Sequence, residues 1–124
     1  MPFIAHKHAP TFELPGASFT GLAAPSRGAT ENAVWIVTLQ PQAPGVLHQV
    51  TREEVFVCIE GKGKALMGGE THEMTPGSAL VVPAGTEFAI SNPGSSLFRA
   101  VAVLPVGGQA WVAGSEPFTP PWAA

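Results

Sequence analysis

Short apolar segments, separated by glycine and proline, run along almost the whole chain. These segments are about five to nine residues long and rich in β-branched and aromatic residues, which favour strands. No stretch of helix length places apolar residues at positions i, i+3, i+4 and i+7. The pattern therefore predicts about nine strands and almost no helix. The predicted strands are residues 11–14, 18–22, 33–39, 54–59, 64–67, 71–74, 80–82, 87–91 and 97–104.

One connection between strands can be predicted in detail. Gly68 and Gly69 lie between the predicted strands 64–67 and 71–74. Both central residues of a type I′ turn have positive φ, so a Gly-Gly pair here indicates an antiparallel hairpin. Many short strands with turns at this spacing are typical of a β-sandwich or a barrel, and the spacing alone does not separate the two.

The chain length of 124 residues fits a single domain. We expect the barrel core to cover about residues 11–112, with an N-terminal arm at 1–10 and a proline-rich tail at 113–124. The prolines prevent this tail from continuing a central strand. Its aromatic residues Phe118 and Trp122 predict that it packs against a sheet or against a partner subunit.

Composition excludes several classes of function. The formal net charge is -3 and lysine and arginine form no cluster, so we expect no nucleic-acid partner. No apolar run approaches the roughly eighteen residues needed to span a bilayer, so we expect no membrane segment. The first residues do not resemble a signal peptide, and the single cysteine, Cys58, cannot form an internal disulfide. A cytoplasmic location is the resulting expectation.

Residues 44–61, PGVLHQVTREEVFVCIEG, resemble the first signature motif of the cupin family. That motif runs His, any residue, His, three or four residues, Glu, six residues, Gly. His48, Glu54 and Gly61 match it in register, and Val50 stands at the position of the second histidine.

Residues 77–92, GSALVVPAGTEFAISN, are similar to the second cupin motif. Its order is Gly, five residues, Pro, any residue, Gly, two residues, His, three residues, Asn. The two glycines, the proline and Asn92 match, whereas Phe88 stands at the position of the histidine. The resemblance implies an all-β jelly-roll barrel, and it implies that barrels pair, so we expect a homodimer.

The resemblance also implies a metal site built from three imidazoles and a carboxylate, which suits iron, manganese, zinc, nickel or copper. Val50 and Phe88 cannot donate an electron pair to a metal. His48 and Glu54 are then the remaining ligands, and two protein ligands rarely hold a metal tightly. If a metal is bound, Gln49 or His72 could act as an additional ligand.

His48 and Glu54 are also the candidates for acid–base chemistry. Residues two apart on a strand share a face, so alternation predicts that both point into the barrel. Alternatively, His48 is a pocket histidine hydrogen-bonded to Glu54, or Glu54 is solvated beside Arg52 and Glu53. We expect Cys58 to be an inert buried thiol.

The expected interior is an apolar pocket with one polar end, as small-molecule sites generally are. Its predicted lining residues are Val50, Phe56, Cys58 and Phe88. The alternative is a barrel packed solid, without a cavity.

Three functions remain open. The leading hypothesis is a barrel protein with a degenerate metal site that binds a small organic molecule and performs acid–base chemistry on it. The second is a metal-dependent enzyme of the oxygenase, isomerase or polyketide cyclase type, using His48, Glu54 and an atypical third ligand. The third is a structural or regulatory dimer with a solid core. Fold alone does not choose among them.

Overall fold

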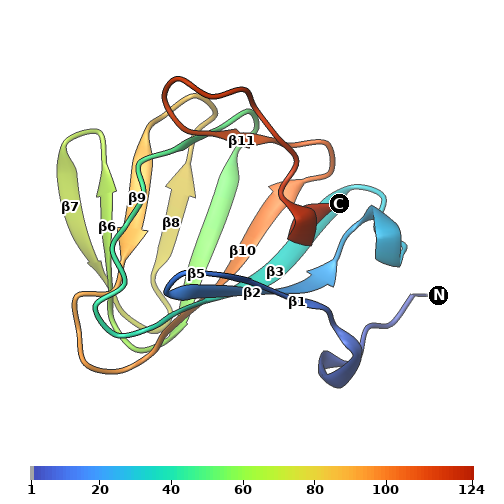
Figure 1. Cartoon of the computed structure of the whole chain (residues 1–124), viewed down its shortest axis with the longest axis horizontal. Coiled ribbons are helices and arrows are strands. Elements are labelled where there is room, and N and C mark those ends of the chain that lie inside the picture. The colour runs from blue at the N-terminus through green and yellow to red at the C-terminus, as the bar shows by residue number, and fades with distance from the viewer. Residues whose placement is uncertain (1) are drawn as a thin grey trace.

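The computed structural model describes residues 2–124 and is built almost entirely from antiparallel strands (Figure 1). The strands are β1 (Thr11–Leu14), β2 (Ala17–Ala23), β3 (Asn32–Leu39), β4 (Gln49–Val50), β5 (Glu54–Glu60), β6 (Gly63–Met67), β7 (Glu70–Met74), β8 (Ala79–Val82), β9 (Phe88–Ser91), β10 (Phe98–Pro105) and β11 (Ala110–Trp111). Three single 3-10 turns, η1 (His6–His8), η2 (Pro25–Arg27) and η3 (Pro121–Ala123), are the helices of residues 2–124, and none could cross a membrane. The prediction of an all-β protein is confirmed.

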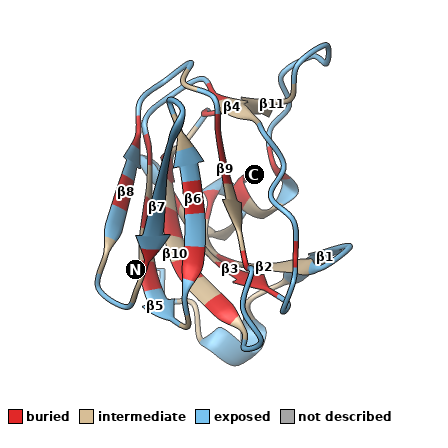
Figure 2. Cartoon of the chain, turned by 90° about the vertical axis from the view of Figure 1, so that its left-hand side faces the viewer, coloured by how far each residue is buried: buried red, intermediate tan, exposed pale blue. Residues whose placement is uncertain are grey.

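The strands form a jelly-roll barrel from one large sheet and two small ones. The large sheet has six strands in the order β1-β2-β3-β10-β5-β8. A three-stranded sheet, β7-β6-β9, lies beside it, and the short pair β11-β4 closes one end. Buried and exposed residues alternate along β6 and β8 (Figure 2), as expected of strands with one face against the core.

The predicted strands are all present, and two short ones were missed. β4 and β11 contain two residues each and pair with each other, Val50 with Ala110 and Gln49 with Trp111. Such a pair has too few residues to produce an alternating pattern. The predicted hairpin at Gly68 and Gly69 is confirmed, since β6 pairs with β7 and both glycines have positive φ, 59° and 79°.

The proline-rich tail packs against its own chain. The Trp122 ring stacks on that of Phe19 in β2, with ring centroids 3.8 Å apart and an interplanar angle of 4°. The Arg27 guanidinium donates a hydrogen bond to the Trp122 carbonyl over 3.3 Å, and Ala123 is buried. The sequence left open whether this tail contacts its own barrel or a partner, and these contacts fix it on the barrel.

Two matched motif residues act as scaffold. Gly61 has a φ of 74°, and a Cβ at this position would collide with the Leu97 carbonyl oxygen, so only glycine fits. The buried Asn92 side chain donates hydrogen bonds to the carbonyls of Leu39 and Ser96, at 3.1 Å and 2.8 Å. Gly61 thus permits a close approach of two chain segments, and the Asn92 side chain joins segments that are distant in the sequence.

Candidate functional site in the barrel interior

Backbone hydrogen bonds bring the two motifs together. His48 and Phe88 are opposite each other on antiparallel segments and exchange both N–H to C=O hydrogen bonds, each 3.0 Å long. The Gly85 N–H donates to the Val50 carbonyl over 2.8 Å. The rings of His48 and Phe88 lie with centroids 4.2 Å apart. The phenyl ring of Phe88 thus stands beside the imidazole, where the motif would place another donor.

β5 supplies the opposite wall. Glu54, Phe56 and Cys58 are buried, whereas the residues between them are only partly buried. Phe56 connects this strand to the motif pair, because its ring centroid lies 5.7 Å from that of Phe88. The rings of His48, Phe88 and Phe56 therefore form a continuous aromatic group that connects the motif pair to β5.

The protonation of His48 follows from one hydrogen bond. Its Nδ1 lies 2.8 Å from the Val46 carbonyl oxygen. A carbonyl can only accept, so Nδ1 carries the proton and Nε2 of the neutral ring keeps its lone pair. Burial lowers the pKa of His48, and the hydrogen bond to Val46 opposes this shift only in part. The imidazole is therefore neutral at pH 7 and offers Nε2 as an acceptor.

Glu54 is a buried carboxyl without a compensating charge. Its side chain is 4% exposed, whereas the neighbouring Arg52 and Glu53 are exposed. Burial raises the pKa of Glu54 to about 8, and no ion pair or hydrogen bond from the described residues offsets that effect. At pH 7 the carboxyl is mainly protonated and can donate a hydrogen bond. The hydrogen bond recorded for His48 goes to Val46 and not to Glu54.

The residues present do not fit a cupin-type metal ion. Val50 is 1% exposed and Phe88 is fully buried, so both apolar side chains occupy interior positions. Gln49 and His72 were the two additional ligands considered from the sequence. The Gln49 side-chain amide N–H donates a hydrogen bond to the Gly85 carbonyl over 2.8 Å. His72 is exposed on β7, with Nε2 3.3 Å from Glu70. Across residues 2–124, no group of three or more His, Cys, Asp or Glu side chains could hold a metal.

Cys58 belongs to the buried hydrophobic core. It is 1% exposed, and its Sγ lies 3.7 Å from the Glu60 carbonyl oxygen and 3.6 Å from that of Gly61. Burial raises the pKa of this thiol above its ordinary value. Since a thiol reacts as the thiolate, burial and the raised pKa both disfavour reaction at Cys58.

Two interior residues near Glu54 were not identified from the sequence. Val82 pairs with Glu54, and Leu80 pairs with Phe56 in the neighbouring β8. Both are buried. Because directly opposed residues share a sheet face, they extend the apolar surroundings of the carboxyl. The alternation of residues 80–82 marks them as inward-facing, but only the register places them beside Glu54.

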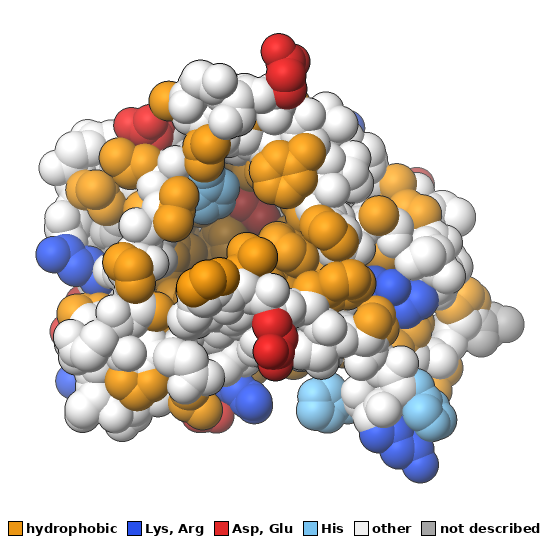
Figure 3. Space-filling view, in the orientation of Figure 1, with side chains coloured by type: hydrophobic (Ala, Val, Ile, Leu, Met, Phe, Trp, Pro, Cys, Tyr) orange, Lys and Arg blue, Asp and Glu red, His pale blue; other side chains and the backbone are white. Residues whose placement is uncertain are grey.

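The space-filling view shows a hollow on the face drawn in Figure 3. Hydrophobic side chains surround most of it, and a histidine and an acidic side chain are visible inside. The hollow therefore has the apolar walls and polar end of a small-molecule site.

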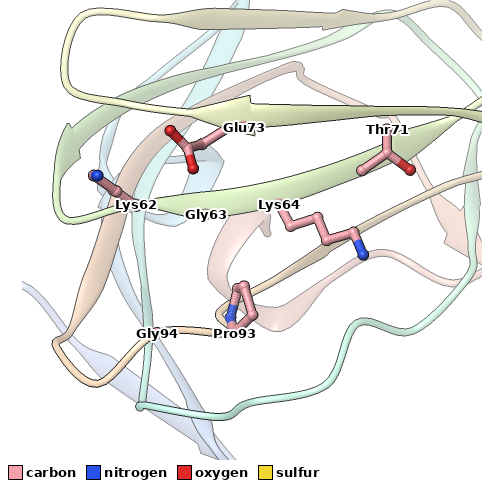
Figure 4. A pocket seen from close by; sticks show the side chains of 7 residues that line it. All are labelled: Lys62, Gly63, Lys64, Thr71, Glu73, Pro93 and Gly94. Atoms are coloured by element: carbon pink, nitrogen blue, oxygen red, sulfur yellow. The ribbon is translucent and has the colours of Figure 1, made fainter.

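A second pocket lies outside the barrel. It is lined by Lys62, Gly63, Lys64, Thr71, Glu73, Pro93 and Gly94 (Figure 4). Both lysines and Glu73 are exposed, so their charges are solvated. This pocket contains none of the motif residues.

The family follows from the comparison of sequences. The family model described as a cupin domain matches residues 35–104, which is more than half of the chain and includes both motifs. The chain belongs to the cupin family.

Curated relatives of this cupin include auxin-binding proteins 5 and 4 of Zea mays. Each is 32% identical to it over 68 residues, or 55% of the chain. The chain spans less than half the length of either relative, 45% of the first and 33% of the second.

Solved structures share the fold at low identity. The polyketide cyclase RemF from Streptomyces resistomycificus has a TM-score of 0.77 at 18% identity, covering 85% of this chain and 79% of that one. KdgF from Halomonas sp. has a TM-score of 0.73 at 18% identity, with coverages of 83% and 93%. Salicylate 1,2-dioxygenase from Pseudoaminobacter salicylatoxidans has a TM-score of 0.71 at 18% identity, with coverages of 86% and 31%. These similarities show the cupin fold and leave the activity open.

Proposed function

We propose that this cupin binds a small, uncharged organic molecule in the barrel interior, without a metal ion. The observation that carries the proposal is the state of Glu54. Its carboxyl is buried among apolar residues, with no cation or metal-binding set nearby to hold it ionised. A protonated carboxyl at pH 7 is a hydrogen-bond donor in a place where the family motif has a metal ligand.

The polar end of the site then has one donor and one acceptor. The protonated carboxyl of Glu54 donates a hydrogen bond. Nε2 of His48 accepts one, because the Nδ1 proton of His48 is already donated to the Val46 carbonyl. A hydroxyl, enol or amide group can satisfy both. The hydrophobic side chains around the hollow favour an apolar body. An anionic ligand would lose its hydration without gaining a cation from these residues.

The same pair can move a proton. Glu54 can protonate a ligand oxygen while Nε2 of His48 accepts a proton from a neighbouring carbon, which interconverts a keto and an enol form. This step needs no metal and no redox partner. We therefore propose that the protein can also catalyse such a proton transfer on the molecule that it binds.

The names of the relatives are consistent with a small-molecule site, but they do not indicate which reaction this site performs. The maize relatives are named for binding auxin, and two of the structural neighbours are named as a cyclase and a dioxygenase. The alternative of a metal-dependent oxygenase, isomerase or cyclase would need a third ligand. Gln49 and His72 are both engaged elsewhere, which favours the metal-free proposal.

The test compares phenol with benzoate, which share a ring and differ in charge. In a ¹⁵N–¹H NMR titration at pH 6.5, phenol should change the chemical shifts of the Val50 and Phe88 amides. Benzoate should bind at least about tenfold more weakly than phenol. Glu54→Met should weaken phenol binding by up to about tenfold, whereas Glu54→Gln, which keeps a donor, should retain it.

Glu53→Met, at the exposed neighbouring position, is the matched control and should bind phenol like wild type. Equal binding of phenol and benzoate would contradict the proposal. So would phenol shifts confined to the surface, or a Glu54→Met protein that binds phenol as wild type does.

A further inference from the structure

The loop that leads into His48 covers one edge of β9. Residues 43–48 run antiparallel to β9, on the side that does not pair with β6 (Figure 1). Backbone hydrogen bonds join the loop to β9 at both ends. One end is the His48–Phe88 pair, and at the other end the Asn92 N–H donates to the Ala43 carbonyl over 3.0 Å. The loop therefore takes the place of a neighbouring strand.

The two ends of this pairing are not evenly spaced. Ala43 lies five residues before His48, whereas Asn92 lies four residues after Phe88. In a regular antiparallel pair, hydrogen-bonded residues recur at every second position of both strands. The loop therefore contains one extra residue, as a β-bulge does. Such a residue interrupts the ladder and changes the direction of the groups beside it.

Val46 lies where the ladder is interrupted. A regular ladder would pair Val46 with Ile90, two positions from the His48–Phe88 pair on each segment. Among the backbone hydrogen bonds of residues 2–124, none joins Val46 to Ile90. The Val46 carbonyl instead accepts a hydrogen bond from Nδ1 of His48 over 2.8 Å. A backbone acceptor that a regular strand would use for pairing is thus available to the imidazole.

Gly45 allows the loop to lie this close to β9. A Cβ at residue 45 would be 3.1 Å from the Ala89 Cβ and 3.2 Å from the Ile90 carbonyl oxygen, and ordinary contacts of a Cβ are 3.4 Å or longer. Both neighbouring atoms belong to the strand or are attached directly to its backbone, so they cannot turn aside as the end of a long side chain can. Any side chain at residue 45 therefore pushes the loop away from β9.

We infer that Gly45 is a positioning residue for the proton acceptor of the proposed reaction. Because residue 45 has no side chain, the loop rests on β9 and the Val46 carbonyl stays at His48. This hydrogen bond keeps the proton on Nδ1 and leaves the lone pair on Nε2. Val46 is exposed, so water can compete for its carbonyl, and a loop displaced from β9 would lose the bond more readily.

The tautomer of His48 decides what the site can do, and in this respect the inference rests on the proposed function. With the proton on Nε2, the site would present two donors, Nε2 of His48 and the protonated carboxyl of Glu54, and no basic nitrogen. It could then not accept a proton from a ligand carbon. Gly45 thus controls the acid–base chemistry through the Val46 carbonyl.

The test measures the tautomer of His48 directly, by ¹⁵N–¹H correlation NMR of the imidazole in ligand-free protein at pH 7. Wild type should carry the proton on Nδ1. Gly45→Val should change the ratio of the two tautomers about fivefold in favour of the Nε2–H form, because one neutral hydrogen bond is lost. Gly45→Ala should change the ratio in the same direction by a smaller factor. It guards against a folding defect, since its contacts require a shift of only a few tenths of an ångström.

Gly94→Val is the matched control. Gly94 is an exposed loop glycine shortly after β9, and a Cβ there would have one atom within 4 Å, Oδ1 of Asn92 at 3.4 Å. This variant should keep the wild-type tautomer ratio. Phenol should bind Gly45→Val about threefold to tenfold more weakly than it binds wild type or Gly94→Val, because the acceptor at Nε2 is partly lost.

A wild-type protein with the proton on Nε2 would overturn the inference. So would Gly45→Val and Gly45→Ala proteins with the wild-type tautomer ratio, or an equal change of the ratio in Gly94→Val. The ratio is measured without a ligand, so it tests the role of Gly45 separately from the binding proposal. If only the binding proposal fails, wild type binds no phenol, and the change of tautomer in Gly45→Val remains.

Discussion

The buried carboxyl of Glu54 should make folding stability depend steeply on pH. Its pKa rises from an ordinary value of 4.5 to about 8 in the folded protein. Between these two values, the native state holds a proton that the unfolded chain has released. The free energy of unfolding therefore falls as pH rises, by up to about 1.4 kcal/mol per pH unit.

The total effect is large. Its contribution is fully present below pH 4.5 and is lost as pH rises through about 8, which amounts to about 5 kcal/mol. Domains of ordinary stability unfold with about 5–15 kcal/mol, so this one group would remove a third of the stability or more. Ionised Glu54 in an apolar interior is the physical cause.

Glu54→Gln isolates this effect, because glutamine has nearly the same shape and does not ionise. The variant should match wild type near pH 5 and exceed it by several kcal/mol at pH 8.5. Glu53→Gln changes the exposed neighbour in the same way and should follow the wild-type curve. Urea unfolding at each pH from 5 to 9 measures the difference, at one fixed protein concentration.

His48 acts in the opposite direction over a lower pH range. Burial lowers its pKa below 6.5, so the unfolded chain binds the proton that the native state has released. Its effect makes stability rise with pH up to about 6.5. His48 is unchanged in Glu54→Gln, so subtracting the two curves removes it. Wild-type and Glu54→Gln curves that stay parallel within about 0.5 kcal/mol from pH 5 to 9 would refute the reasoning.

The other predictions concern the lost metal ligands and the tail. Val50→His, and then Val50→His with Phe88→His, should raise metal affinity in two steps, because each adds an imidazole on the interior face beside His48. Untagged, chelator-dialysed wild type should contain far less than one metal per chain by elemental analysis; close to one metal, removed by His48→Ala, would contradict this. Trp122→Ala should lower the free energy of unfolding by about 3 kcal/mol through loss of the stacked ring, measured by urea titration. A loss below about 0.5 kcal/mol would show that the tail contributes no packing.

The local pattern was enough for the strands and the family. Alternating apolar residues and glycine-marked turns predicted the longer strands, because each of these features depends on residues close together in the chain. β4 and β11 were not predicted, because they form through pairing between residues some sixty positions apart in the sequence. The tail was ambiguous for the same reason: its aromatic residues require a surface, and the sequence does not say which one.

The candidate site shows the same division. The sequence by itself determined the all-β barrel, the positions of His48 and Glu54, and the absence of an imidazole at Val50 and Phe88, because spacing and residue type suffice for these. Only the tertiary structure decided that Glu54 is buried without a counter-charge. It also decided that Nδ1 of His48 donates to Val46, which leaves Nε2 as a hydrogen-bond acceptor. Burial and hydrogen bonds depend on strands brought together from distant parts of the chain, and they set the pKa values on which the chemistry depends.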